Sequence, residues 1–259
     1  MMRALWTASS GMMAQQLNID VISHNLSNVN TNGFKKSRAE FQDLLYETIQ
    51  GAAPTPGGGY TPSALAVGHG VRPSATLRLF SAGNLQPTQN PLDVAIEGDG
   101  FFVVELPTGE QAYTRDGSFK LNGDGDLVTT DGYLVMPGIN IPPGAKNIAI
   151  APDGTITYEL TGETITGDQI TLALFPNPAG LQARGRNLFM ATEAAGPLED
   201  GLIPGEECGS LASTYLELSN VQVVEEMVNM ITAQRAYEIN AKAITAADEM
   251  LGVANNLRR

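Results

Sequence analysis

Proline and glycine are confined almost entirely to the middle of this 259-residue chain. Residues 1–50 and 211–259 contain no proline and three glycines, whereas residues 51–210 hold all 15 prolines and 25 of the 28 glycines. Both residue types interrupt helices and favour turns. The sequence therefore predicts an α+β protein with a helix at each end and a turn-rich β region between them. Such an arrangement favours a subunit that assembles over one that catalyses a reaction.

The formal charge of −13 is carried mainly by the middle of the chain. Residues 51–210 hold seven basic and eighteen acidic side chains, a net of −11, and the two ends are nearly neutral. Nucleic acids and anionic membrane surfaces attract basic patches, so neither is expected as a partner. An acidic middle that faces water keeps a monomer soluble, and neutral ends suit packing against copies of the same chain.

Neither a secretory leader nor an intramolecular disulfide is expected. The N-terminus lacks a basic start followed by an apolar run of about 7–15 residues, and no run of about 18 apolar residues exists. Cys208 is the single cysteine, and we interpret it as an unpaired thiol without a role. We expect a chain that stays in the cytosol or leaves it by a route without a cleaved signal.

Apolar residues recur every seven positions near the N-terminus. The main series is Leu5, Met12, Ile19 and Leu26. A second series runs three residues later through Ile22. The pattern predicts a helix from about residue 4 to 30, ~40 Å long and ended by Gly33. Its polar side carries amides, which suits a helix surrounded by other helices. The alternative is an ordinary amphipathic helix packed on its own domain.

A second heptad pattern runs toward the C-terminus. Its main series is Leu216, Val223, Met230, Tyr237, Ile244 and Leu251, and its partner positions are Asn220, Met227, Gln234, Ala241 and Asp248. Thr214 followed by Glu217 is typical of a capping box, so a helix of ~63 Å is expected over residues 214–256. The middle of the chain cannot cover so long a stripe. The two ends therefore pair with each other, with other copies, or with both.

Short strand-like runs alternate with turn dipeptides in the middle of the chain. The expected strands lie at residues 101–104, 118–121, 127–129, 148–150, 156–158 and 170–174. This pattern predicts an antiparallel β domain of hairpins and meanders. Residues 51–66 are too polar and too rich in proline and glycine for a core, so a loop or extended arm is expected there.

No catalytic, cofactor-binding or metal-ligating residue is expected. Residues 122–126 resemble the start of a calcium loop, but Leu127 stands where glycine is needed and Tyr133 where glutamate is needed. We predict a hairpin turn at this place. His24 and His69 lie in separate segments without a nearby cysteine or carboxylate cluster. A secreted carbohydrate-active enzyme is a rival interpretation, but it requires paired carboxylates in a cleft.

Four separated motifs resemble those of bacterial flagellar rod and hook proteins. Residues 23–35 (SHNLSNVNTNGFK) are similar to the N-terminal signature of that family, and residues 218–240 are similar to its C-terminal signature. GDGFF at 98–102 and YTRDGSF at 113–119 resemble the shared β-domain motif. The length and the insertion at about 46–71 resemble the distal rod type. The alternative is a hook or proximal rod subunit.

The resemblance implies a structural subunit without a cofactor. Its terminal helices would pair and stack into the inner wall of a hollow helical tube, its β domain would form the outer wall, and its arm would bridge neighbours. The tube would carry torque from motor to hook. The implied partners are copies of the same chain, proximal rod and hook subunits, the surrounding rings of the outer membrane and peptidoglycan, and the flagellar type III export apparatus. The implied location is the periplasm-spanning rod of the basal body.

Three domains and a set of assembly residues follow from these expectations. Residues 1–33 with 211–259 would form a coiled-coil-like helical assembly domain, 34–75 an extended or β arm, and 76–210 a central β domain. The family motif residues are Asn25, Asn28, Thr31, Gly33 and Phe34. The expected assembly residues are Leu5, Met12, Ile19, Ile22, Leu26, Asn28, Val223, Met227, Met230, Arg235, Tyr237, Asn240, Ile244 and Leu251, with Arg235 and Asn240 making polar contacts between helices.

Overall fold

The computed structural model describes residues 2–51, 64–160, 162–205 and 208–256. The chain divides into two compact units. The helical unit consists of Met1–Leu26, Ser37–Leu77 and Gln222–Arg259, and the β unit consists of Ser27–Lys36 and Arg78–Val221. The predicted α+β class is confirmed, because a helix stands at each end of a mostly antiparallel β region.

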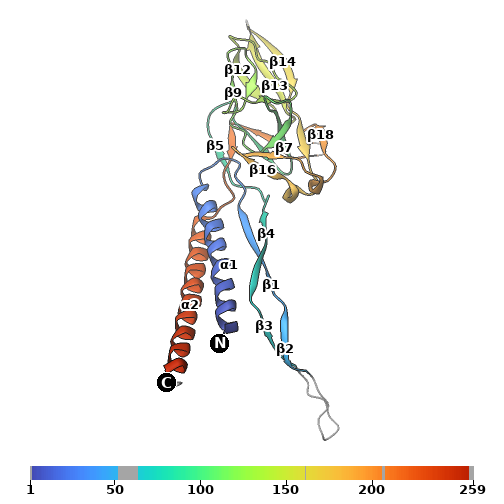
Figure 1. Cartoon of the computed structure of the whole chain (residues 1–259). Coiled ribbons are helices and arrows are strands. Elements are labelled where there is room, and N and C mark those ends of the chain that lie inside the picture. Colours follow the sequence, from blue (N-terminus) through green and yellow to red (C-terminus); the bar gives the residue numbers. More distant parts are fainter. Residues whose placement is uncertain (1, 52–63, 161, 206–207, 257–259) are drawn as a thin grey trace. The chain divides into compact units, whose positions relative to one another are not determined.

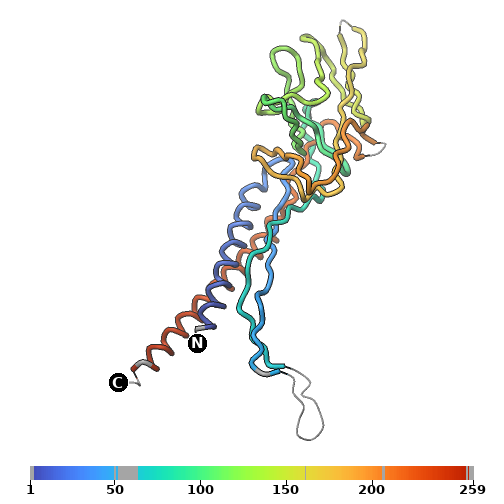
Figure 2. The backbone as a smooth tube through the Cα atoms, turned by 45° about the vertical axis from the view of Figure 1, so that its right-hand side comes forward, coloured from blue at the N-terminus to red at the C-terminus, as the bar shows by residue number. Residues whose placement is uncertain are grey.

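The helical unit contains two helices and a long β hairpin. Helix α1 (Met2–Ser27) and helix α2 (Val223–Asn256) lie side by side and run in opposite directions (Figures 1 and 2). In the hairpin, β1 (Ser37–Asp43) pairs with β4 (Val71–Arg78), and β2 (Tyr46–Gln50) pairs with β3 (Leu65–Gly68). Residues 52–63 of the predicted arm lie outside the described residues.

The second helix begins nine residues later than the sequence pattern predicted, at Val223 rather than Thr214. The predicted capping box is wrong: Thr214 has a φ of 67°, and residues 215–217 form strand β20 (Tyr215–Glu217). Strand β20 pairs with β5 (Leu85–Pro87), so Leu216 lies in a sheet rather than on a helix. Pairing with a distant strand and ion pairs of the Glu217 carboxylate outweigh the local helical signal.

The first helix ends at Ser27, slightly before the predicted residue 30. Gly33 then adopts a φ of +65°, which favours glycine. A Cβ atom there would lie 2.7 Å from the carbonyl carbon of Arg115 and from the amide nitrogen of Asp116. Any larger residue at position 33 would therefore strain the turn and push the backbone of residues 115–116 away.

The β unit is built from one large sheet and several small ones. The large sheet has the order β16-β17-β8-β7-β11-β10-β9, and β15 pairs with both β7 and β18. Its strands are β7 (Phe101–Glu105), β8 (Gln111–Thr114), β9 (Lys120–Leu121), β10 (Leu127–Val128), β11 (Leu134–Val135), β15 (Leu172–Leu174), β16 (Gln182–Gly185), β17 (Leu188–Met190) and β18 (Glu199–Leu202). The smaller sheets are β5 paired with β20, β6 (Val94–Glu97) paired with β19 (Ser210–Ser213), and a three-stranded sheet of β12 (Lys146–Ile150), β13 (Thr155–Leu160) and β14 (Glu163–Gln169).

The apolar side chains of β7 contribute to two hydrophobic clusters, one on each face of the strand. Successive side chains of a strand point to opposite faces. Phe102 and Val104 accordingly belong to a large apolar cluster, whereas Phe101 and Val103 belong to a second cluster, in which four of the eight buried side chains are aromatic. Both clusters lie in the β unit. This burial on both faces explains why β7 shows a continuous apolar run instead of the alternation of a half-exposed strand.

Each of the strands predicted in the middle of the chain overlaps an observed strand. The predicted hairpin turn at residues 122–126 is confirmed, because β9 and β10 flank it and pair antiparallel. The carboxylate of Asp126 accepts hydrogen bonds from the side chains of Asn122 and Asn140, which lower its pKa. Several other strands had no signal of their own, including β14, β16 and β18, whose residues are largely polar or exposed.

Candidate functional site

Several small and polar side chains are buried where α1 and α2 pack against each other, at a set of positions that we call the seam. Along α2, Glu226, Ala233 and Ala247 are buried, and Asn240 continues their seven-residue spacing. A Cβ atom on Gly11 would lie 2.9 Å from the Nδ2 atom of Asn240, so the helices approach closely at this point. Glycine is unfavourable inside a helix, and this close approach explains its presence in α1.

Asn25 joins three elements of the helical unit. Its Nδ2 atom donates to the carbonyl oxygen of Ser37 at 2.8 Å, and its Oδ1 atom accepts from the amide of Ser37 at 2.9 Å. The same Nδ2 donates to the Oε2 atom of Glu226 at 3.3 Å. One buried amide therefore ties the last turn of α1 to the first residue of β1 and to the first turn of α2.

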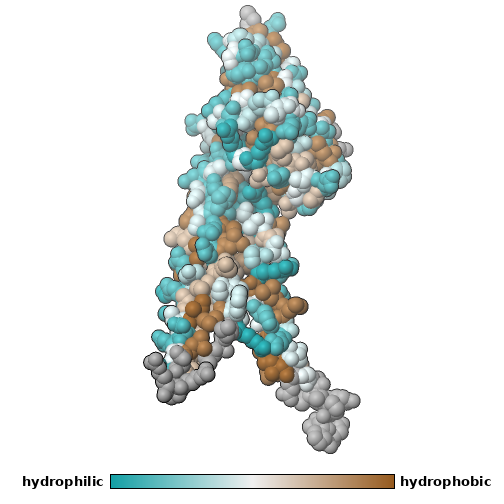
Figure 3. All heavy atoms as spheres, in the orientation of Figure 1, coloured by the Kyte–Doolittle hydropathy of each residue, from teal (hydrophilic) through white to brown (hydrophobic). Residues whose placement is uncertain are grey.

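Large apolar side chains remain exposed over much of the helical unit. On α1, Trp6 is 74% exposed, and on α2, Val224 is 76% exposed. The hairpin shows the same property at Leu45, which is 87% exposed. Other exposed members are Met13, Tyr46, Ile49, Leu65, Val67, Val223, Met227, Val228, Ile231, Tyr237, Ile239, Met250 and Val253. In Figure 3, apolar spheres gather over these helices and over the hairpin.

The structure distributes the predicted assembly residues over different environments. On α1, Ile22 is buried, and Leu5, Met12, Ile19 and Leu26 are partly buried. On α2, Met230, Asn240, Ile244 and Leu251 are partly buried, whereas Val223, Met227, Tyr237 and Arg235 are exposed. Arg235 pairs with Glu238 on its own helix at 3.1 Å. The close approach to Gly11 places Asn240 at the seam between the helices. The role of these residues in assembly stays a prediction.

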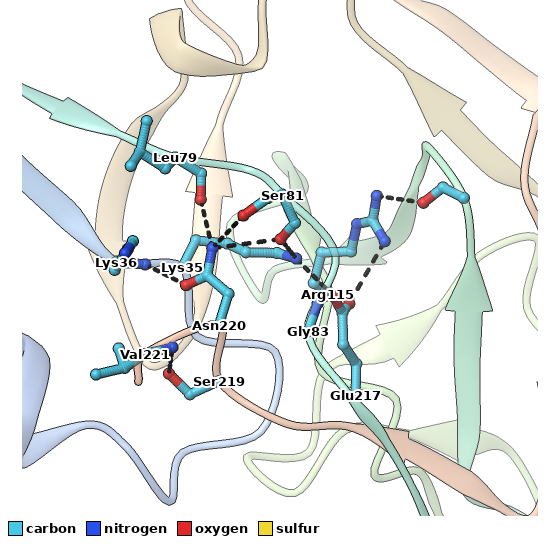
Figure 4. A network of polar contacts seen from close by, with 11 residues as sticks. Lys35, Lys36, Leu79, Ser81, Gly83, Arg115, Glu217, Ser219, Asn220 and Val221 are labelled. Atoms are coloured by element: carbon cyan, nitrogen blue, oxygen red, sulfur yellow. Dashed lines mark hydrogen bonds and ion pairs between the residues drawn. The ribbon is translucent and has the colours of Figure 1, made fainter. Parts of the chain in front are cut away.

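A buried ion cluster ties together the two chain segments, 27–36 and 78–221, that make up the β unit (Figure 4). The Lys35 ammonium donates to Glu217 Oε1 at 2.5 Å and to the carbonyl oxygen of Ser81 at 2.8 Å. Arg115 Nη1 donates to Glu217 Oε2 at 3.4 Å, and its Nη2 donates to the carbonyl oxygen of Gly98 at 2.8 Å. The three charged side chains are at most 2% exposed.

Burial lowers the pKa of both cations in this cluster. Removal from water lowers the pKa of Lys35, and the attraction of Glu217 only partly opposes that shift. Burial likewise lowers the pKa of Arg115, again against the attraction of Glu217. Replacing such a cluster by apolar groups can be neutral for stability, whereas removing one partner leaves an uncompensated charge. The cluster therefore specifies one arrangement of these segments more than it adds stability.

The side chain of Asn220 holds the segment just before α2 against two other parts of the β unit. Its Oδ1 accepts from the amide of Lys36 at 2.7 Å, and its Nδ2 donates to the carbonyl oxygen of Leu79 at 2.9 Å and to Ser81 Oγ at 3.0 Å (Figure 4). The heptad pattern had placed Asn220 on a helix, which is wrong. A side-chain amide that satisfies backbone groups of two other segments acts as a clamp.

Among the described residues, no helix is long and apolar enough to cross a membrane. The same residues contain no group of three or more His, Cys, Asp or Glu side chains placed to hold a metal ion.

Comparisons with known proteins match models of one family to three parts of the chain. Residues 5–35 match "Flagella basal body rod protein", residues 95–158 match "Flagellar hook protein FlgE/F/G D1 domain", and residues 212–257 match "Flagellar basal body rod FlgEFG protein C-terminal". Relatives called flagellar basal-body rod protein FlgG match over full length. The one from Borreliella burgdorferi is 52% identical over 100% of both chains. The one from Caulobacter vibrioides is 48% identical over 99% of this chain and 100% of the relative.

The chain belongs to the flagellar basal-body rod proteins.

This rod protein is a structural subunit of the flagellar basal body. Its similarity to FlgG proteins extends over the full length of the chain. Together with the chain length and the insertion after the first helix, this similarity assigns it to the distal rod. The matched N-terminal model ends at residue 35, and the matched C-terminal model begins at residue 212. Both models therefore include the segments that Lys35, Glu217 and Asn220 hold together in this rod protein.

Sequence reasoning missed the function of the charged members of this cluster. Lys35 closes the N-terminal motif and Arg115 lies in the β-domain motif, but Glu217 was interpreted as part of a cap. One signal was available: Lys35 and Arg115 are cations inside motifs otherwise dominated by uncharged residues. Buried cations require carboxylate partners, but Glu217 lies just before the C-terminal motif at 218–240, so the motifs alone did not identify it.

Proposed function

We propose that this distal rod subunit polymerises through its helical unit into a hollow helical shaft. The shaft carries motor torque to the hook and encloses the export channel. In this proposal the two terminal helices form a coiled-coil-like inner wall with helices of neighbouring copies, and the β unit forms the outer wall. The observation that carries the proposal is the exposure of large apolar side chains along α1, α2 and the hairpin.

Burying these side chains against neighbours provides the driving force for assembly. Each large apolar side chain contributes on the order of 1.5–3 kcal/mol when it leaves water completely. The intrachain seam does not use them, because Gly11, Asn25, Glu226 and Ala233 occupy it. A helix pair held by such a seam keeps its large apolar positions, such as Val224 and Ile231, free for other copies.

The finer partners and location belong to the same proposal. The chain would meet proximal rod subunits at one end of the shaft and hook subunits at the other, with the outer-membrane and peptidoglycan rings around it. It would reach the periplasm through the flagellar type III export apparatus. The role is structural and involves no catalysis, in line with the names of the relatives.

Replacing Met230 by aspartate tests the assembly proposal. Met230→Asp places a charge on the partly buried face of α2, where burial in a polymer would be costly. We expect the variant to stay monomeric under concentrating conditions while the wild-type chain forms tubes of uniform diameter in electron microscopy. Far-ultraviolet circular dichroism should show that the β unit stays folded. Ile165→Asp, on the exposed face of β14, is the matched control and should still assemble.

Trp6 offers a second readout, because it is the single tryptophan and is 74% exposed. Assembly through α1 should move Trp6 out of water and shift its fluorescence to shorter wavelength. Tubes that form without any such shift would place α1 outside the interface. If Met230→Asp still formed tubes, the face of α2 that carries Met230 would not belong to the interface between copies.

A further inference from the structure

Residues 210–221, which we call the strap, supply the pairing partners of two earlier strands of the β unit. Among the described residues, β19 is the only partner strand of β6, and β20 is the only partner strand of β5. Isolated two-stranded sheets are marginally stable. Strands β5 and β6 therefore depend on the strap for their pairing, whereas the strands of the large sheet pair with one another.

Four backbone amides outside these strands also donate to acceptors on the strap, and we call them the reporter amides. The pairs are the amide of Gly33 with the carbonyl oxygen of Glu217 at 2.8 Å, that of Lys36 with Asn220 Oδ1 at 2.7 Å, that of Gly83 with Glu217 Oε1 at 2.8 Å, and that of Thr88 with the carbonyl oxygen of Thr214 at 2.9 Å (Figure 4 shows the second and third). Their protection from solvent exchange therefore reports whether the strap is in place.

Few apolar side chains hold the strap. Leu211 is its one member of the large apolar cluster, and Val221 is its other buried apolar residue. When the strap leaves, Lys35, Arg115 and Glu217 return to water, which compensates for the loss of their mutual contacts. Burial lowers the pKa of both cations, so their charged forms are better solvated outside the cluster. The strap can therefore open at a lower free energy than the core unfolds.

Closure of the strap joins parts of the chain that are far apart in sequence. Lys35 and Glu217 are 182 residues apart, and the entropic cost of closing a loop grows with its length. The large sheet contains more local pairings, such as that of the consecutive strands β7 and β8. The core therefore needs no contact with the strap to begin forming, and the strap has to find a core that is already there.

We propose that residues 210–221 open and close as one cooperative unit on a core that stays folded. In the open state, all four reporter amides lose their acceptors together, and β5 and β6 lose their partner strands. One consequence concerns the proposed export and rests on it. Because the strap and residues 33–36 lie at opposite ends of the β unit in sequence, a chain passing through a channel cannot close this unit until both ends are through.

Native-state hydrogen exchange of the dilute full-length chain, followed by nuclear magnetic resonance at low urea concentrations, tests the strap. We expect the four reporter amides to share one opening constant and one dependence on urea. That constant should be at least about tenfold larger than those of Leu127 and Met136, whose amides donate to Ile139 and Val103 in the core. Unequal constants among the reporters would overturn the cooperative unit. Constants equal to those of the core amides would show that the strap leaves only when the whole β unit unfolds.

A reversible disulfide across the strap tests its cooperativity directly. Pro87 and Tyr215 are exposed and lie opposite each other in β5 and β20, at a spacing that a disulfide can bridge. In a Cys208→Ser chain, oxidation of Pro87→Cys with Tyr215→Cys should slow exchange of all four reporter amides about tenfold or more relative to the reduced chain. Slowing of the Thr88 amide alone, next to the disulfide, would mean that the strap does not move as a unit.

The matched control places the disulfide away from the strap. Lys146 and Glu159 lie opposite each other in β12 and β13, and Lys146→Cys with Glu159→Cys in the same Cys208→Ser background should leave the reporter amides unchanged on oxidation. Equal slowing by both disulfides would assign the effect to the whole β unit and overturn the strap. All of these measurements use the unassembled chain, so failure of the strap leaves the proposed polymerisation standing, and failure of polymerisation leaves the strap standing.

Discussion

The two units of this rod protein differ in the burial of their large apolar side chains. In the β unit, Phe102, Phe119 and Leu172 are buried almost completely, as members of one continuous cluster. In the helical unit, the buried positions are mostly small, such as Ala14 and Ala247, and the large side chains are exposed. The β unit therefore has a core of its own, whereas in the proposed assembly the helical unit would obtain one from neighbouring copies.

The two units also differ in which charged and polar side chains they bury. The β unit buries a complete ion cluster, so each of its charged members has a fixed partner. The helical unit buries an amide and a carboxylate, Asn25 and Glu226, at its intrachain seam and leaves the apolar positions outside. Buried polar contacts thus occur in both units, whereas large apolar side chains are buried in the β unit and, in the proposed assembly, would be buried between copies in the helical unit.

The largest expected effect comes from breaking the ion cluster. Glu217→Gln leaves Lys35 and Arg115 as two buried cations without a carboxylate. We expect a loss of about 3–5 kcal/mol in the free energy of unfolding of the β unit. Urea denaturation followed by circular dichroism measures it. Glu110→Gln, which breaks an exposed ion pair with Arg184, should change the same free energy by less than about 1 kcal/mol.

A smaller loss is expected from the polar junction of the helical unit. Asn25→Ala leaves backbone groups of Ser37 and the buried carboxylate of Glu226 without their partner. We expect a cost of about 1–3 kcal/mol, confined to the helical unit. Hydrogen exchange should show faster opening of the amides in the last turn of α1. Gln16→Ala, on the exposed side of the same helix, is the control. Equal exchange in both variants would mean that the junction contributes nothing.

A pH titration separates the ion cluster from the rest of the molecule. Because burial lowers the pKa of folded Lys35 below its ordinary value of 10.5, the unfolded chain binds more protons between those two values. The contribution of Lys35 to the free energy of unfolding should therefore rise as pH rises through the folded pKa toward 10.5. Lys35→Met, which keeps the Arg115–Glu217 pair, should lack this rise. A wild-type curve parallel to that of the variant would contradict the assigned direction.

The smallest effect on the monomer is expected on the exposed stripe of α2. Val224→Ser removes an apolar side chain that is 76% exposed. The free energy of unfolding of the monomer should change by no more than about 0.5 kcal/mol, while the critical concentration for polymerisation should rise. Sedimentation of polymers over a concentration series measures the second effect. If the variant assembled as readily as the wild type but unfolded more easily, the stripe would belong to folding, and the contrast between the units would fail.

Local sequence patterns predicted the organisation of the chain well where structure follows from neighbours in sequence. The absence of proline from both ends located the helices, and turn dipeptides located the hairpin at residues 122–126. Periodicity failed at the start of α2, because Leu216 continues the heptad spacing but belongs to β20. The deciding contact there joins Lys35 to Glu217, which are 182 residues apart. No window along the sequence contains both.

The candidate assembly surface illustrates a different limit. A heptad of large apolar residues indicates a buried face, but it does not say whether the partner lies in the same chain. In this chain the intrachain partners are Gly11 and Asn25, and Val223 and Met227 remain exposed. Small residues such as Gly11 and Ala233 carry little hydrophobic signal. The close approach of the two helices therefore became visible only in the structure.

The ion cluster also has a mechanical consequence. Lys35 lies at the end of the first segment of the β unit and Glu217 near the end of the second, so their bond closes the chain between them into a noncovalent ring. A force that pulls on the segments flanking the β unit would act on this ion pair and on the hydrogen bonds of Asn220 before it acts on the strands of the core. We expect the ion cluster to bear part of such a load, so that the β unit keeps its fold while force passes along the chain ends.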